Sequence, residues 1–244
     1  MLAPRRASGP PGSEGRWSLL PVIEGVSPTE RLEATATQLL ERHGVLTREA
    51  VNAEALPGGF GAIYPVLKAM EEAGRVRRGY FIAGLGATQF AVPGAEDRLR
   101  KHRDPEEESL VLLASDDPAN VYGAALPWPE READGARPQR AAGARVVLHD
   151  GVLIGYVGKT GHSVLTFLPD DERTRPKTAG ALARALARAS NTKARAVLIK
   201  RIDGEDPLGS TLAPHLQEAG FSPTSRGFHR RLEREQSGSL DRIG

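Results

Sequence analysis

Hydrophobic positions in the first third of the chain recur at helical spacing in three consecutive segments. The first starts after Ser27, which is followed by a proline at the first helical position and a glutamate placed to close a capping box, and it stops near Gly44. Thr47 is placed to cap a second, short helix. A third helix is predicted around 60–73, after the Gly-rich turn at 57–59. The pattern therefore predicts three helices in succession.

Two strand-like runs follow the third helix, at 75–82 and 87–92, and a Gly-rich turn at 83–86 separates them. Three helices followed by a two-stranded hairpin is the order of a winged-helix domain. In that arrangement the third helix is the recognition helix and the hairpin is the wing. A short helix at about 95–102 is expected after the wing.

From residue 145 onward the pattern becomes β-rich. Three strand-like runs at 145–149, 152–157 and 163–168 predict an antiparallel meander, with Asp150-Gly151 supplying the positive φ of the first hairpin turn. A helix, a strand, a second helix and a last strand are expected next, at about 178–190, 195–202, 210–219 and 226–232. The predicted fold class is α+β: an N-terminal winged-helix domain followed by a β-rich α+β domain with a three-strand meander and then alternating helix and strand.

Stretches poor in apolar residues set the expected domain boundaries. Residues 1–16 are rich in proline, glycine, serine and arginine and are expected to be a disordered linker. Residues 104–140 are rich in acids and prolines and are predicted to be a linker or long loop, in which 110–113 is a candidate short strand. The winged-helix domain is thus assigned to 17–103, the β-rich domain to 141–234 and a disordered tail to 235–244.

Composition narrows the function classes only a little. The chain has 244 residues and no cysteine, which excludes disulfides and thiolate metal sites. No run approaches 18 apolar residues and the N-terminus lacks the profile of a signal peptide. We therefore expect a cytoplasmic protein without a membrane partner.

Charge is segregated along the chain, although the net charge is only +2. Residues 173–201 contain nine Lys or Arg and no acid, whereas acids dominate 96–117. Such a basic run fits a polyanion partner, and it fits a solvated helix face equally well. The candidate polyanion on this basis is nucleic acid.

Candidate nucleic-acid-binding residues lie in both predicted domains. Guanidinium groups at the base of the wing could donate paired hydrogen bonds to phosphates. The candidates are Tyr64 and Lys68 on the third helix, Arg75, Arg77 and Arg78 at the wing, and Arg184 and Arg188 as a stripe on the helix of the second domain. Winged-helix domains also serve as protein-docking modules whose arginines are merely solvated, so both interpretations stay open.

The tripeptide Gly158-Lys159-Thr160 suggests the tip of a nucleotide-binding P-loop. That loop needs a glycine at position 153, which is leucine here, and a helix directly after it. A strand-like run follows instead, so the tripeptide is interpreted as the tip of a β-hairpin.

The most specific stretch of the chain is GVLTREAVNAEALPGGFGAIYPVLKAMEEAGRVRRGYFIAGLGATQFAVPGAEDRLR, at 44–100. It resembles a winged-helix segment in the C-terminal extension of Lhr-type (large helicase-related) proteins, which are superfamily 2 DEAD/DEAH-box ATP-dependent DNA helicases. Further segments resemble the same family in the same order: 15–18, 117–120, 122–123, 126–129 and 150–151. The resemblance covers roughly residues 15–232.

This resemblance implies a DNA-binding accessory fragment of a helicase that takes part in DNA repair. The family couples ATP hydrolysis to translocation on single-stranded DNA, and its motor is two RecA-like domains that lie upstream and are missing here. ATP and Mg would be used by those missing domains, so we expect no cofactor, no metal and no catalytic residue in this chain. A helicase core is an expected partner.

Two alternatives remain beside DNA binding. One is a protein-docking winged helix within a helicase assembly. The other is DNA glycosylase activity, which has been connected with this part of the family and which needs a carboxylate or a water-positioning amide beside a flipped base. The available groups are Asp116, Asp117, Asp150, Asp203 and Gln89, and their spacing selects none of them. Trp17 and Trp128 are candidates for stacking on an unpaired base, although packing of a linker onto the domain is preferred.

Overall fold

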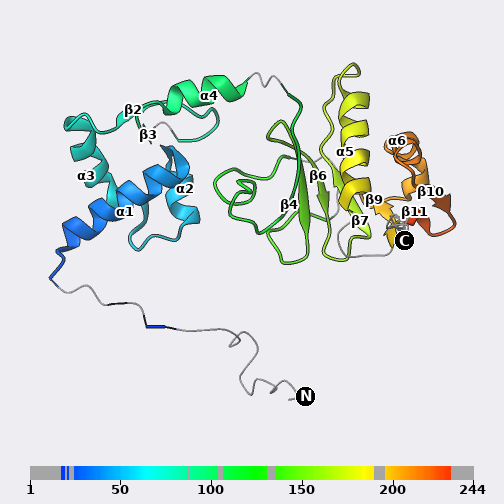
Figure 1. Cartoon of the computed structure of the whole chain (residues 1–244), viewed down its shortest axis with the longest axis horizontal. Helices are drawn as coiled ribbons and strands as arrows, with labels where there is room; N and C mark the ends of the chain where they lie inside the picture. Colours follow the sequence, from blue (N-terminus) through cyan, green and yellow to red (C-terminus); the bar gives the residue numbers. More distant parts are fainter. Residues whose placement is uncertain are drawn as a thin grey trace, which may run out of the picture.

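The computed structural model describes residues 18, 19, 21, 25–86, 88–103, 107–130, 136–189 and 196–231. Three helices and a small sheet make up the first domain (Figure 1). The helices are α1 (Pro28–His43), α2 (Arg48–Ala53) and α3 (Gly59–Glu72). The antiparallel sheet has the order β1-β3-β2, formed by Val45–Leu46, Gln89–Ala91 and Arg77–Gly79. This is the predicted winged-helix order, followed by α4 (Ala95–Arg103).

The capping signals read from the sequence are present at the start of α1. Ser27 Oγ accepts from the backbone N–H of Glu30 at 3.2 Å, and Glu30 accepts in return from the backbone N–H of Ser27 at 2.8 Å. The apolar face of each predicted helix is buried, because the positions three and four residues apart all face one core. That core contains Ala36, Leu39, Leu40, Ile63, Leu67, Met70 and Phe90.

The wing strands are shorter than the sequence predicted, and a side chain explains why. Gln89 is fully buried. Its Oε1 accepts from the backbone N–H groups of Phe81 and Ile82, and its Nε2 donates to the carbonyls of Ile82 and Gly86. These bonds take the place of strand pairing, so residues 80–86 form a loop over the end of β3. The two-residue strand β1 was not predicted.

The second domain is built on a five-stranded sheet of order β4-β5-β6-β7-β9. The strands are Leu110–Ala114, Arg145–His149, Val152–Val157, Ser163–Thr166 and Arg201–Ile202. The predicted meander β5-β6-β7 is confirmed, and positive φ angles of 50° at Asp150 and 79° at Gly151 form its first turn. All five residues of β4 pair with β5, so the second domain begins before residue 141. The acids and prolines on both sides of β4 made this segment resemble a linker.

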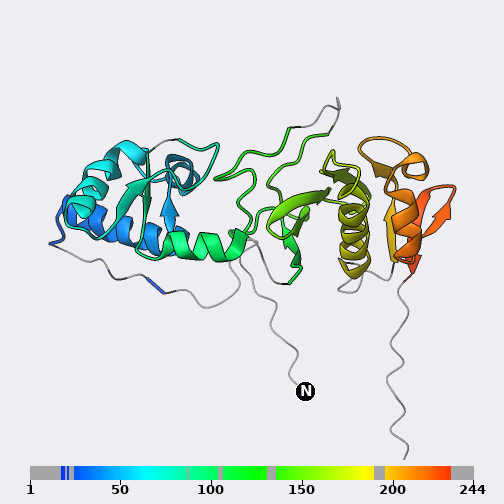
Figure 2. The same ribbon diagram turned by 90° about the horizontal axis from the view of Figure 1, so that it is seen from above.

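Helix α5 (Arg175–Ala189) lies between the large sheet and a second layer (Figures 1 and 2). That layer contains α6 (Ala213–Glu218) and a sheet of order β10-β11-β8, formed by Ser222–Thr224, Gly227–Arg231 and Ala196–Ile199. Because α5 is covered on two sides, most of its middle turns are buried alanine and leucine, while Arg184 remains exposed.

The strand predicted at 195–202 is divided between the two sheets. Ala196–Ile199 pairs with β11, whereas Arg201–Ile202 runs parallel to β7. The 3₁₀ turn at Pro207–Gly209 then leads to α6, where a single helix was expected at 210–219. The second domain is nevertheless the predicted α+β type, although β10 was not predicted. Within the described ranges, no helix is both long and apolar enough to cross a lipid bilayer.

Candidate nucleic-acid interface

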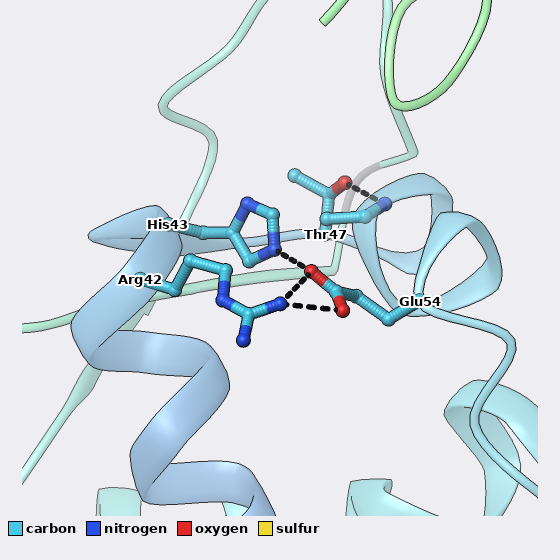
Figure 3. Close-up of polar contacts among 5 residues, drawn as sticks. Arg42, His43, Thr47 and Glu54 are labelled. Carbon is cyan, nitrogen blue, oxygen red and sulfur yellow. Dashed lines mark hydrogen bonds and ion pairs between the residues drawn. The ribbon is translucent and has the colours of Figure 1, made fainter. Parts of the chain in front are cut away.

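An acid at the end of α2 joins this helix to the end of α1 in the first domain. Both carboxylate oxygens of Glu54, the C-cap of α2, accept from Nη1 of Arg42 at 2.8 and 2.7 Å, and Oε1 also accepts from Nε2 of His43 at 3.0 Å (Figure 3). Thr47 caps the start of α2 by accepting from the backbone N–H of Ala50. The last turn of α1 is thereby tied to the end of α2, and Thr47 closes the start of α2 by itself.

The ionised form of Glu54 is favoured by these contacts. The hydrogen bond from Arg42 is the main cause that lowers the pKa of Glu54 below its ordinary value of 4.5, and the contact with His43 adds to it. Partial burial acts in the opposite direction. Glu54 is therefore a charged part of the fold at neutral pH.

The predicted cations of the first domain are largely paired with acids. Arg75 pairs with Glu33 of α1, and Nε of Arg78 lies 3.3 Å from Oε1 of Glu71. Nζ of Lys68 lies 3.7 Å from Oε1 of Glu72, four residues further along α3. All of these pairs are exposed to a considerable extent, so a phosphate could displace the carboxylates at small cost.

Arg77 differs from its two neighbours. It is exposed on β2 and takes part in no ion pair within the described ranges. Tyr64, by contrast, is half-buried between the rings of Phe60 and Phe90, at centroid distances of 5.9 and 6.1 Å. It packs against the winged-helix core rather than offering a free ring to a base.

The two candidates on α5 also have different surroundings. Nη2 of Arg184 lies 3.2 Å from Oε1 of Glu108, an acid that also lies within 2.8 Å of Nε2 of His149. Arg188 is exposed and has no ion pair among the described residues. The predicted stripe therefore contains one paired and one unpaired cation.

A shallow groove of about 390 Å³ runs between α1 and α3. Its floor is mostly apolar, and the ion pair of Glu33 with Arg75 borders it. The apolar lining residues are Leu32, Ala62, Pro65, Val66, Ala69, Met70 and Ala73. The exposed positions of α3 are thus small or apolar apart from the pair of Lys68 and Glu72.

The groups considered for glycosylase chemistry mostly hold the fold together. Asp203 accepts from the backbone N–H and the hydroxyl of Thr166 at 2.8 and 2.7 Å, and Asp150 accepts from the backbone N–H of Ser109 at 2.7 Å. Asp117 accepts from a backbone N–H two residues further on, which is the geometry of an Asx turn.

The remaining two groups differ from each other. The buried amide of Gln89 is saturated by the wing loop, whereas Asp116 is exposed. Trp128 lies against Tyr122 and Tyr156, with ring centroids 6.5 and 5.9 Å away, so its observed contacts are packing contacts.

Four exposed cations outside the predicted set gather at one end of the five-stranded sheet. We call them the basic edge: Lys159, Lys200, Arg201 and Arg226. They are brought together by the β6–β7 hairpin, the β8–β9 corner and the β10–β11 turn. The sequence pointed separately to the polar hairpin at Lys159 and to the basic run 173–201 that ends with Lys200 and Arg201. It did not predict that these residues and Arg226 meet, because residues so far apart give no local signal.

A helix-turn-helix with a wing, joined to an α+β domain, defines the chain as a winged-helix protein. A family model described as the winged-helix domain of the large helicase-related protein matches residues 25–111. The chain is 44% identical over 233 residues to a protein of Mycolicibacterium smegmatis named Lhr helicase/probable uracil glycosylase. It is 37% identical over 231 residues to an Escherichia coli K12 protein named Lhr helicase/uracil glycosylase.

These alignments cover 91% and 93% of this chain and 15% of each relative. The chain therefore belongs to the large helicase-related family, and residues 25–111 are its winged-helix domain. The resemblance found in the sequence is confirmed. The chain spans about 15% of the length of the relatives that it matches.

Proposed function

We propose that this chain is a DNA-binding part of a large helicase-related DNA helicase that acts in DNA repair in the cytoplasm. ATP and Mg²⁺ would serve a motor in other parts of such a helicase, and the partners of the chain would be DNA and the helicase core. The observation that supports the proposal is the winged-helix domain of this family at residues 25–111. Winged helices share the helix-turn-helix that places a recognition helix against DNA.

The ion pairs of the wing arginines are compatible with DNA contact. An exposed ion pair contributes only about 0 to 1 kcal/mol, whereas a charge-assisted hydrogen bond contributes about 1.5 to 3 kcal/mol. A phosphate can therefore replace Glu33 beside Arg75, or Glu71 beside Arg78, with a net gain. Arg77 is exposed and has no ion pair to break among the described residues.

The proposal is tested by measuring the affinity of the purified chain for fluorescent single-stranded and duplex DNA at two salt concentrations. Because the contacts are mainly to phosphates, affinity should fall steeply with salt and depend weakly on sequence. Joint substitution of Arg75, Arg77 and Arg78 by alanine should weaken binding by roughly 1 to 3 kcal/mol.

A matched variant separates phosphate contact from general charge. Glu33→Gln removes the acid that competes for Arg75, so it should strengthen binding if Arg75 contacts phosphate. Glu41→Gln removes an equal charge from the same helix, at an exposed position with no ion pair within the described ranges, and controls for the change in net charge. Absence of binding even at low salt would contradict the proposal.

The groove between α1 and α3 supports a second candidate function, docking of a protein segment. Its apolar floor and the small exposed residues of α3 offer little that could read base edges. On this alternative, the chain would bind DNA negligibly but would retain a helicase core in a pull-down. A substitution such as Ala69→Glu would then abolish the retention.

A third candidate is supported by the names of the two relatives, which both include uracil glycosylase. Of the five groups considered from the sequence, Asp116 is exposed, and its carboxylate accepts no hydrogen bond within the described ranges. The guanidinium of Arg140 donates to its backbone carbonyl instead. Formation of an abasic product from a uracil-containing oligonucleotide by this chain would support the glycosylase, and loss of that product in Asp116→Asn would locate it.

A further inference from the structure

The basic edge is a structural unit because three turns meet there. Register places the end of β6, the start of β7 and the start of β9 at the same end of the sheet: Val157 pairs with Val164, and Ser163 pairs with Arg201. The hairpin tip with Lys159 therefore projects from the end at which β9 begins.

Backbone hydrogen bonds fix the hairpin to the β8–β9 corner. The carbonyl of His162 accepts from the backbone N–H of Lys200 at 2.8 Å and from that of Arg201 at 3.2 Å. Nδ1 of His162 donates to the carbonyl of Leu198 at 2.8 Å. Three bonds thus join the hairpin and the corner, so the backbone positions that carry the cations of both segments are held side by side.

The β10–β11 turn is pressed against the same corner. A Cβ built on Gly227 would lie 2.0 Å from the carbonyl oxygen of Ile199 and 3.1 Å from Cα of Lys200. Only glycine permits this approach, and its φ of 113° also favours glycine. Arg226 is the residue directly before Gly227 and is exposed, so the turn adds a fourth cation to the edge.

The charges of the basic edge are not neutralised by the fold. Within the described ranges, none of its four cations forms an ion pair, in contrast to Arg75, Arg78 and Arg184. Acids gather at the other end of the sheet, where Glu108 precedes β4, Asp150 follows β5 and Asp203 binds Thr166. Asp116 and Asp117 share the basic end, but they follow β4, which is the opposite edge strand from β9. Glu205 lies beside β9, bridged to Ile202, and forms no ion pair with the four cations within the described ranges.

We propose that the basic edge binds the phosphodiester backbone of nucleic acid and is the main phosphate contact of the second domain. This inference rests on the proposed DNA-binding function and assigns part of the DNA contact to the second domain. Exposed ammonium and guanidinium groups without ion pairs, on backbone segments that hydrogen bonds hold together, suit a chain of phosphates. Lysine neutralises a phosphate as a point charge, and arginine can donate two parallel hydrogen bonds to it. Arg201 also donates to the carbonyl of Gly204 at 2.8 Å, which orients its guanidinium.

The test compares two double variants of the whole chain that lose the same charge. One is Lys159→Ala with Lys200→Ala at the basic edge. The other is Arg173→Ala with Lys177→Ala, two exposed cations that come after the far end of β7 and have no ion pair among the described residues. All four side chains are exposed, so the thermal melting curves of both variants should match the parent.

Affinity for a single-stranded and a duplex oligonucleotide is measured over a range of salt. The edge variant should bind roughly tenfold or more weakly, and its log–log salt slope should fall by about one unit per lysine removed. The control variant should keep the parent slope. Lys159→Arg with Lys200→Arg keeps both charges and should retain the parent slope as well.

Each outcome decides between the two proposals. Equal losses in the edge and control variants, or a parent slope in the edge variant, would overturn the inference while leaving DNA binding intact. Failure of the parent chain to bind either oligonucleotide would overturn the proposed function together with the inference. A loss confined to the edge variant supports both.

Discussion

Glu54 links the first two helices of the winged-helix domain through its side chain. Its carboxylate joins the end of α1 to the end of α2 through Arg42 and His43. The side chain of Arg42 is 54% exposed and that of Glu54 is 27% exposed, so solvent screens the pair and its contribution is about 1 kcal/mol. The residue matters for position more than for total stability.

Replacing Glu54 by glutamine should lower the melting temperature at neutral pH but much less in acid. The folded pKa of Glu54 lies below its ordinary value of 4.5, so its stabilising effect is complete above that value and is lost as pH falls through the lowered folded pKa. The difference between parent and variant should therefore shrink below about pH 4.5. Thermal denaturation followed by circular dichroism at several pH values measures it, and a difference independent of pH would contradict the assignment.

At the scale of elements, the second domain depends on the close approach of β6 and α5. Gly155 of β6 faces Leu182 of α5, and a Cβ at Gly155 would lie 2.4 Å from Cδ1 of Leu182. Leu182 is fully buried and belongs to the core that α5 shares with both layers. The leucine fills the space that the missing side chain leaves.

Gly155→Ala should therefore destabilise the domain by about 1 to 3 kcal/mol through overpacking. In a Leu182→Ala background the clash is removed, so the same substitution should have a much smaller effect. A double-mutant cycle by chemical denaturation measures the coupling. Additive effects would show that the contact does not limit the approach of the helix.

Local signals in the sequence predicted these elements well, because caps and turns act over a few residues. Ser27 and Asp150-Gly151 form the cap and the turn expected of them. The division of 196–202 between two sheets was invisible, since the run of β-branched residues is continuous and only its partners differ.

The candidate site was less predictable for a related reason. The acids that pair with Arg75 and Arg184 lie 42 and 76 residues away in the chain. Spacing along the sequence identifies a cation but not its counter-charge. The same limit hid the basic edge, whose members meet only after the sheet has formed.

At the scale of the whole molecule, the buried residues separate into cores that belong to one domain or the other. The largest cluster joins α5 and α6 with strands of both sheets of the second domain, and the next contains α1, α2, α3 and β3. Only Lys200 separates β8 of one sheet from β9 of the other, and residues of α5 share one core with both sheets, so the two layers of the second domain are joined by the chain and by that core.

The second domain should therefore open as one cooperative unit. Native-state hydrogen exchange over increasing denaturant should give amides in β6, α5 and β11 a common opening free energy, and amides in α1 and α3 a separate one. Exchange of β11 at much lower denaturant than β6 would show that the two layers open independently.

The unpaired cations of the basic edge give one end of the five-stranded sheet a local positive charge. In the field of a polyanion such a domain rotates before contact, so that its positive end leads the approach. Encounters then start from a favourable orientation, which raises the association rate at low ionic strength and leaves the dissociation rate to short-range contacts. The charge at one end of the sheet thus orients the domain before any residue contacts the nucleic acid.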